Sequence, residues 1–157
     1  MKKRFYFGLL TLMSFSMALS SCSNNDDENP IDNTQQIAQI EANIESGTWR
    51  VTSLIDLGLD KTSDFTGYNF TFESNGTLTA SNGTTTLSGT WYVANDSSDD
   101  DGSNDIEFNI FFPVSDSNDF EELNEDWDVV STSATKIELS DISDDNVNTD
   151  RLTFEKN

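Results

Sequence analysis

Apolar and polar side chains alternate along most of the chain after Thr48, and this two-residue period limits the fold more than any other feature. Successive side chains of a β-strand point to opposite faces of a sheet, so alternation predicts strands with one buried and one solvated face. Eight such runs predict an all-β domain. They contain Trp49, Val51 and Ile55; Tyr68, Phe70 and Phe72; residues 77–81; Leu87, Gly89, Trp91 and Val93; Ile106, Phe108, Ile110 and Phe112; Trp127 and Val129; Ile137 and Leu139; and Leu152 and Phe154.

Short turns separate several of these runs. Asn75-Gly76 and Asn82-Gly83 tolerate the positive φ angles of a type I′ turn, so they predict two tight hairpins. These hairpins join predicted strands at 67–74, 77–81 and 84–93, and residues 131–134 form a later short connection. Eight strands with sequential connections predict an up-and-down antiparallel barrel, because closure removes the exposed edges of the sheet. A β-sandwich of the same strands is the alternative fold.

A segment with helical periodicity precedes the predicted strands. Asn33 is a good N-cap residue and Gly47 ends the run, and between them isoleucine recurs at helical spacing, at Ile37, Ile40 and Ile44. This apolar stripe is narrow, so the sequence predicts one short N-terminal amphipathic helix that leans on one end of the sheet structure. A single helical turn is also predicted over residues 119–125, with Asp119 as its cap.

The first 21 residues have the pattern of a secretory signal peptide. Lys2, Lys3 and Arg4 form its basic start, and residues 5–19 follow as an apolar run of 15 residues. A transmembrane helix needs about 20 apolar residues to cross the hydrocarbon layer, so a membrane span is the weaker interpretation. We therefore expect residues 1–21 to be removed on export.

The residues around Cys22 resemble the lipobox of bacterial lipoproteins. In Leu19-Ser20-Ser21-Cys22, an apolar residue and two small residues precede the cysteine. The resemblance implies cleavage just before Cys22, lipidation of its thiol and anchoring in a membrane by acyl chains such as palmitate, of which two or more make a stable anchor. The alternative is an ordinary signal peptide followed by a free thiol. Cys22 is the only cysteine, so no intrachain disulfide can form.

Residues 22–33 are polar and acidic, and we expect them to form a disordered tether between the lipid and a domain at residues 34–157. Asp26-Asp27-Glu28 resembles the acidic export signal of surface lipoproteins in Gram-negative bacteria. This resemblance implies a lipid-anchored protein of the outer membrane that faces the cell surface. A merely solvated linker on a lipoprotein that faces the periplasm is the alternative.

The domain resembles the lipocalin-like domains of bacterial lipoproteins. Gly47-Thr48-Trp49 matches the lipocalin G-x-W signature, and the resemblance covers residues 47–157. It implies an eight-stranded barrel in which the Trp49 side chain closes one end beneath the N-terminal helix. It also implies an arginine that packs over this tryptophan, and Arg151 stands in a suitable place near the last strand.

The composition excludes several classes of function. Without the signal peptide, five basic and 29 acidic residues remain, and this formal net charge of −24 repels nucleic acids and anionic lipid headgroups. The chain has no histidine and its one thiol is assigned to lipid, so Ser-His-Asp and Cys-His sites and imidazole zinc sites are excluded. We expect a protein that is not an enzyme and that has no cofactor and no metal site.

Aromatic rings crowd the predicted inner face of the barrel. Two interpretations are open: the rings line a cavity that holds a small apolar or glycan ligand, as the resemblance implies, or they fill a small core. The rings predicted to contact such a ligand are Trp49, Tyr68, Phe70, Phe72, Trp91, Phe108 and Trp127.

The sequence therefore favours a lipid-anchored, surface-exposed, non-enzymatic binding module. One alternative is a structural or interaction subunit of an outer-membrane assembly, which docks a protein partner through acidic loops. Another is a calcium-dependent adhesion module, because residues 96–105 gather oxygen ligands around Gly102. That loop departs from the EF-hand pattern, since Ser97 and Phe108 stand at its first and twelfth positions.

Overall fold

The computed structural model describes residues 33–95, 106–142 and 149–157. The predicted signal peptide, Cys22, residues 22–32 of the predicted tether and the acidic loop at 96–105 lie outside these ranges. Within them the chain forms one α-helix, nine strands and two 3-10 turns. In chain order these are α1 (Thr34–Ile44), β1 (Trp49–Asp56), β2 (Leu59–Asp60), η1 (Thr62–Phe65), β3 (Asn69–Phe72), β4 (Thr77–Ser81), β5 (Thr86–Asn95), β6 (Ile106–Phe111), η2 (Asp119–Leu123), β7 (Asp126–Thr132), β8 (Lys136–Ile142) and β9 (Thr149–Lys156).

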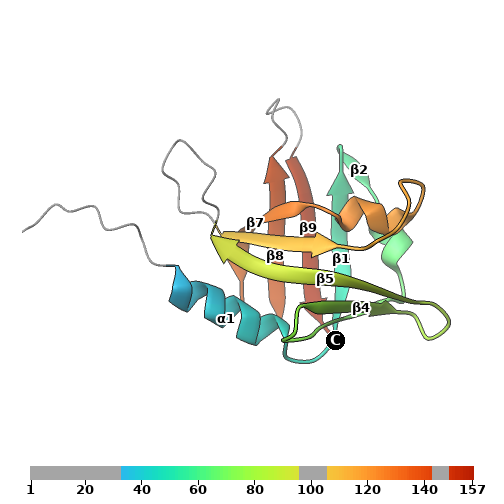
Figure 1. The fold of residues 1–157 in the computed structure, drawn as a ribbon. Coiled ribbons are helices and arrows are strands. Elements are labelled where there is room, and N and C mark those ends of the chain that lie inside the picture. The colour runs from blue at the N-terminus through green and yellow to red at the C-terminus, as the bar shows by residue number, and fades with distance from the viewer. Residues whose placement is uncertain (1–32, 96–105, 143–148) are drawn as a thin grey trace, which may run out of the picture.

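The strands close into an eight-stranded antiparallel up-and-down barrel, as the sequence predicted (Figure 1). From β3 to β9 every strand pairs with the next strand in the sequence, and β1 pairs with both β9 and β3 to complete the circle. β1 meets β9 from Trp49↔Lys156 to Ile55↔Arg151, whereas Trp49↔Phe70 is the registered pair that joins it to β3. The alternative of a β-sandwich is therefore wrong. Strand β2 is a short addition to the end of β1.

Residues that alternate in the sequence point alternately to the inside and the outside of the barrel. In β5, Trp91 and Val93 point inward and are buried, whereas Tyr92 between them faces solvent. In β6, Phe108 and Ile110 are buried in the same way. Burial of each large apolar side chain contributes roughly 1.5–3 kcal/mol, so the alternating inward residues are the main source of stability.

Helix α1 lies across one end of the barrel (Figure 1). Its inner face carries Ile40 and Ile44, which are fully buried and belong to the same core as the inward residues of the strands. The helix thus covers apolar side chains that the strands alone would leave open to water. The predicted helix is confirmed, but Asn33 makes no capping hydrogen bond with its side chain.

The hairpin turns differ from the predicted type. Both hairpins form, but Asn75 and Asn82 keep a negative φ and only the glycines that follow them are left-handed, so the prediction of type I′ turns is wrong. The asparagine side chains hold the turns instead. Asn75 Oδ1 accepts a hydrogen bond from Thr77 N, and Asn82 Oδ1 accepts from Thr84 N and Thr85 N. Such bonds imitate a backbone turn and stabilise it.

A left-handed turn that the sequence did not reveal joins β1 to β2. Leu57 has a φ of 47° and Gly58 a φ of 78°, between the registered pair Asp56 and Leu59. Left-handed backbone costs a residue other than glycine about 1–2 kcal/mol. The carboxylate of Asp150 accepts a hydrogen bond from Leu57 N at 2.7 Å, and this bond holds the turn against the start of β9.

Candidate functional site

The rings that the sequence placed on the inner face lie inside the barrel. Tyr68 is partly exposed, and the other six predicted ligand-contacting residues are at most 4% exposed: Trp49, Phe70, Phe72, Trp91, Phe108 and Trp127. Phe72 meets three rings edge to face, with centroid distances of 5.4 Å to Trp91, 5.8 Å to Phe108 and 5.6 Å to Phe154. Protein side chains therefore pack against one another in the middle of the barrel. The ligand role of these rings stays a prediction.

Trp49 closes the end of the barrel beneath α1. Its indole Nε1 donates a hydrogen bond to the carbonyl oxygen of Ile44 at 2.7 Å, and the ammonium nitrogen of Lys156 lies 5.8 Å from the centroid of its ring. An ammonium in this position is attracted to the face of the indole. We expected Arg151 there, but Arg151 pairs with Ile55 toward the other end of β1, so that expectation is wrong.

A row of side chains crosses the outer wall of the barrel over β5, β6 and β7. Tyr92 lies opposite Asn109, and Asn109 lies opposite Asp126. Side chains directly opposite in antiparallel strands share one face, with Cβ atoms roughly 4.5–5.5 Å apart. Each of the three residues has a buried neighbour in its strand, so the row as a whole faces outward.

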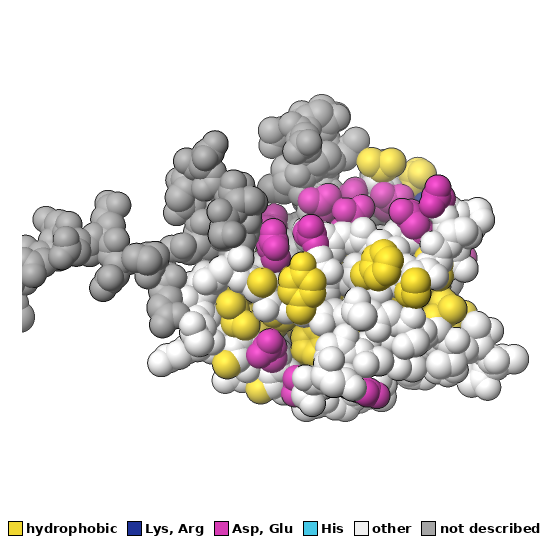
Figure 2. Space-filling view, in the orientation of Figure 1, with side chains coloured by type: hydrophobic (Ala, Val, Ile, Leu, Met, Phe, Trp, Pro, Cys, Tyr) yellow, Lys and Arg dark blue, Asp and Glu magenta, His cyan; other side chains and the backbone are white. Residues whose placement is uncertain are grey.

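Two aromatic rings on this wall are open to solvent. Tyr92 and Phe111 are each 51% exposed, and Phe111 lies opposite Thr90, which places the two rings diagonally across β5 and β6. Figure 2 shows hydrophobic side chains over β5 and β6, below a row of acidic side chains over η2 and β7. Exposed aromatic residues beside polar groups are typical of binding surfaces.

An open pocket of about 190 Å³ lies beside these rings. Its lining residues are Asn109, Ile110, Phe111, Asn124, Glu125 and Asp126. The pocket overlaps the cross-strand row at Asn109 and Asp126, so the rings, the row and the pocket form one continuous surface. We call Tyr92, Asn109, Phe111, Glu125 and Asp126 the wall site.

Asn124 fixes the shape of this pocket. Its Oδ1 accepts a hydrogen bond from Phe112 N at 2.6 Å, and its Nδ2 donates one to Phe112 O at 2.9 Å. This one side chain thus satisfies both backbone groups of Phe112, as a neighbouring strand would. Turn η2 ends just before it and confirms the predicted helical turn, although Asn118 and not Asp119 caps it by accepting from Phe120 N at 3.0 Å. Asn124 therefore holds the end of β6 against the segment that leads into β7.

The polar groups of the wall site are available to a ligand. Within the described part of the chain, the hydroxyl of Tyr92, the side-chain amide of Asn109 and the carboxylates of Glu125 and Asp126 make no hydrogen bond or ion pair. Partial burial raises the pKa of Glu125, and four neighbouring carboxylates, of which Asp141 acts most strongly, raise it further. The site thus concentrates negative charge beside two exposed rings.

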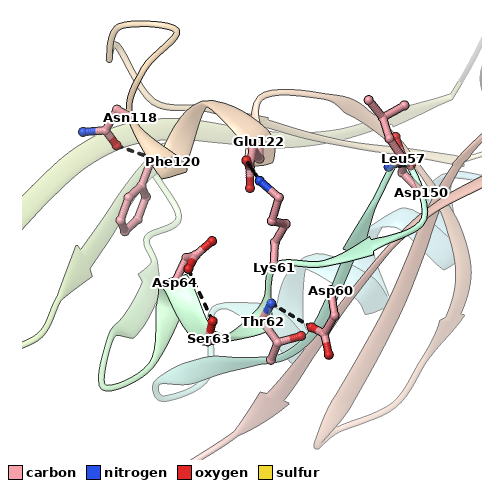
Figure 3. A network of polar contacts seen from close by, with 10 residues as sticks. All are labelled: Leu57, Asp60, Lys61, Thr62, Ser63, Asp64, Asn118, Phe120, Glu122 and Asp150. Carbon is pink, nitrogen blue, oxygen red and sulfur yellow. Dashed lines mark hydrogen bonds and ion pairs between the residues drawn. The ribbon is translucent and has the colours of Figure 1, made fainter.

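A second polar network lies around β2, η1 and η2 (Figure 3), and β2 pairs with the end of β1 that is away from α1. The ammonium group of Lys61 pairs with the carboxylate of Glu122 in η2, and the carboxylate of Asp60 accepts a hydrogen bond from Thr62 N at 3.0 Å. Burial, and after it two neighbouring carboxylates, raises the pKa of Asp56 beside this network. These contacts tie η1 and η2 to the end of β1, which is a structural role.

Neither metal ligation nor a membrane-spanning helix is found in residues 33–95, 106–142 and 149–157. Over these ranges, no three or more acidic or cysteine side chains gather in a way that could hold a metal ion. No helix there is long and apolar enough to cross a membrane. The loop at 96–105, on which the calcium alternative rests, lies outside the described residues.

Comparison with known proteins finds a solved structure of similar fold. No known protein family matches the chain, and no curated protein does. The fold is similar to the crystal structure of a DUF4847 family protein from Bacteroides vulgatus, with 21% sequence identity and a TM-score of 0.47. The similarity covers 75% of this chain and 97% of that chain.

Sequence reasoning did not single out the wall site. Tyr92 and Phe111 occupy the outward phase of alternating strands, where a large ring is unusual, and this signal was present in the sequence. The alignment of Tyr92 with Asn109, and of Asn109 with Asp126, could not be read from the chain, because it depends on the register of three strands.

Proposed function

We propose that the protein is a lipid-anchored, non-enzymatic binding module on the surface of the bacterial outer membrane, and that it binds its ligand at the wall site. The choice of the wall site rests on a contrast between the inner rings and the rings on the outer wall. The inner rings pack against one another, whereas Tyr92 and Phe111 face solvent beside polar groups that have no partner among the described residues. A ligand at the wall displaces only water, while a ligand in the interior must displace packed side chains.

The lipid anchor is supported by Leu19-Ser20-Ser21-Cys22 and tested by lipid labelling. In the host, labelled palmitate should enter the wild-type chain but not the Cys22→Ala variant, and the variant should move to the soluble fraction. Absence of label from the wild type, or retention of the variant in the membrane pellet, would contradict the anchor.

Exposure at the cell surface is supported by Asp26-Asp27-Glu28 and tested with protease added to intact cells. The domain should be degraded without disruption of the outer membrane. A domain that is degraded only after permeabilisation faces the periplasm, and that outcome would refute surface display while leaving the anchor in place.

The position of ligand binding is tested with the ¹⁵N-labelled lipoprotein purified in detergent. Size fractions of the host's growth medium and envelope are added, and changes in the backbone resonances are mapped. Changes confined to the outer residues of β5, β6 and β7 support the wall site. Changes centred on inward residues such as Phe72 and Trp91 would move the ligand to the interior. No change with any fraction would contradict a binding role of the barrel.

A further inference from the structure

We infer that the ligand of the wall site is a neutral saccharide chain. The inference rests on the proposed function, in which the wall site is the binding surface, and it adds the chemistry of the ligand. Three features carry it: the exposed rings, the hydrogen-bonding groups between and beside them, and the sign of their charge.

The rings supply apolar surface of the kind that sugars use. Tyr92 and Phe111 are diagonal neighbours on the same face of β5 and β6, and the Cα atoms of such neighbours lie roughly 7–8 Å apart. The faces of a pyranose ring carry C–H groups with partial positive charge, and the face of an aromatic ring is negative, so the two attract each other. Two such rings on one wall offer successive contacts to an extended chain.

The polar groups match hydroxyl groups. The carboxylates of Glu125 and Asp126 accept hydrogen bonds, whereas the amide of Asn109 and the hydroxyl of Tyr92 both donate and accept. A sugar hydroxyl also donates and accepts, so it can satisfy each of them, and a hydrogen bond to a carboxylate is stronger than one between neutral groups. A purely apolar ligand would cover these groups and leave them without partners, which is costly.

The charge of the site selects against two other classes of ligand. The wall site contains no lysine or arginine, and the adjacent carboxylates of Glu125 and Asp126 repel acidic sugars and phosphates. A lysine-rich or arginine-rich peptide is attracted by the same charge. However, its cationic side chains only donate hydrogen bonds, so the Nδ2 hydrogens of Asn109 must find an acceptor in the peptide backbone, whereas every hydroxyl of a sugar can accept from them. A neutral saccharide meets both requirements.

The size of the pocket favours a chain over a free monosaccharide. Its volume of about 190 Å³ is below the roughly 300–1,000 Å³ of pockets that enclose a whole ligand. The pocket therefore holds one part of the ligand, next to Phe111, Glu125 and Asp126. The remainder lies across the outer wall toward Tyr92.

Isothermal titration calorimetry tests the inference on the lipoprotein in detergent. The probes are neutral oligosaccharides built from hexoses, pentoses and N-acetylhexosamines, together with pentalysine, at about 0.1 M and about 1 M salt. We expect binding of at least one oligosaccharide that does not depend on salt. Tyr92→Ala and Asp126→Asn should each weaken it about tenfold or more.

A matched control is Leu59→Ala, which alters a side chain that is 61% exposed on β2, away from the wall site. It should bind as the wild type does, and all variants should keep the wild-type melting temperature to within a few degrees. Tyr92 and Asp126 are exposed, so their substitution changes the surface and not the core.

Three outcomes overturn the inference. Binding of pentalysine alone, weakened by salt and by Asp126→Asn, would show that the wall site binds cationic chains; the proposed function would stand and its ligand class would change. The proposed function would also stand if no probe bound while host fractions still shifted the resonances of β5, β6 and β7. Oligosaccharide binding that survives both substitutions would place the saccharide elsewhere on the molecule.

Discussion

Among the glycines that the structure describes, Gly89 in β5 is expected to be the least tolerant of a methyl group. A Cβ atom there would lie 2.2 Å from the carbonyl oxygen of Phe111 and 2.9 Å from Cδ1 of Phe112. Ordinary contact begins near 3.4 Å, so β6 would have to move by about 1 Å. The obstacle is backbone of the paired strand and cannot rotate away. Overpacking commonly costs 1–3 kcal/mol, and we expect Gly89→Ala to lower the free energy of unfolding by about 3 kcal/mol.

Urea unfolding, followed by the fluorescence of the three tryptophans, measures this loss. A change of about 3 kcal/mol corresponds to a melting temperature lower by about 10 °C in a domain of this size. Ser88→Ala, at the neighbouring exposed position, is the control and should change stability by no more than about 0.5 kcal/mol. If Gly89→Ala loses less than about 1 kcal/mol, then β6 does not approach β5 as closely as described, and the geometry of the wall site at Phe111 must be revised.

Three further substitutions test other parts of the structure. Leu57→Asn should raise the free energy of unfolding by about 1 kcal/mol in urea titrations, because asparagine adopts left-handed backbone more easily, and a loss would contradict the turn. Trp49→Phe should lower it by about 2 kcal/mol in the same assay, since the carbonyl of Ile44 loses its buried donor; an unchanged midpoint would argue against that bond. Burial raises the pKa of Asp56 above its ordinary value of 3.8, so the native state holds this proton at a higher pH than the unfolded chain does. Stability should therefore fall as the pH rises from about 4 through the raised pKa, and Asp56→Asn should flatten that part of the curve; equal slopes for both proteins would refute this cause.

The barrel could be predicted from the sequence because alternation is a direct consequence of strand geometry. Trp91, Tyr92 and Val93 show it within three residues, and their burial follows the predicted phase. Details that depend on contacts between distant residues could not be predicted. Lys156 and not Arg151 reaches Trp49, because the register of β1 with β9 decides which cation meets the indole.

Turn geometry was harder to predict than strand position. Asn75-Gly76 has the composition of a type I′ turn, yet the asparagine side chain binds Thr77 N and keeps its own φ negative. The turn with two left-handed residues lies at Leu57-Gly58, where leucine conceals it. The strain of that turn is offset by a contact with a distant part of the chain, because Leu57 N donates a hydrogen bond to the carboxylate of Asp150.

The wall site could not be predicted from the periodicity of the sequence. Periodicity assigns Tyr92 to the outer face, but it does not say which side chains of β6 and β7 stand beside it. The inner rings were easier to find, because every inward aromatic residue contributes to the same periodic signal. A site made of outward residues from three strands has no comparable signature.

The first strand finds its main neighbour in the last one, since Trp49 at the start of β1 lies opposite Lys156 at the end of β9. Contacts between residues so distant in sequence form late and slowly, because the intervening chain must first be ordered. If the chain is exported N-terminus first, as proposed, β9 emerges after every other strand of the barrel. On the far side the barrel then cannot close before β9 has emerged, because β1 lacks its main partner until that moment.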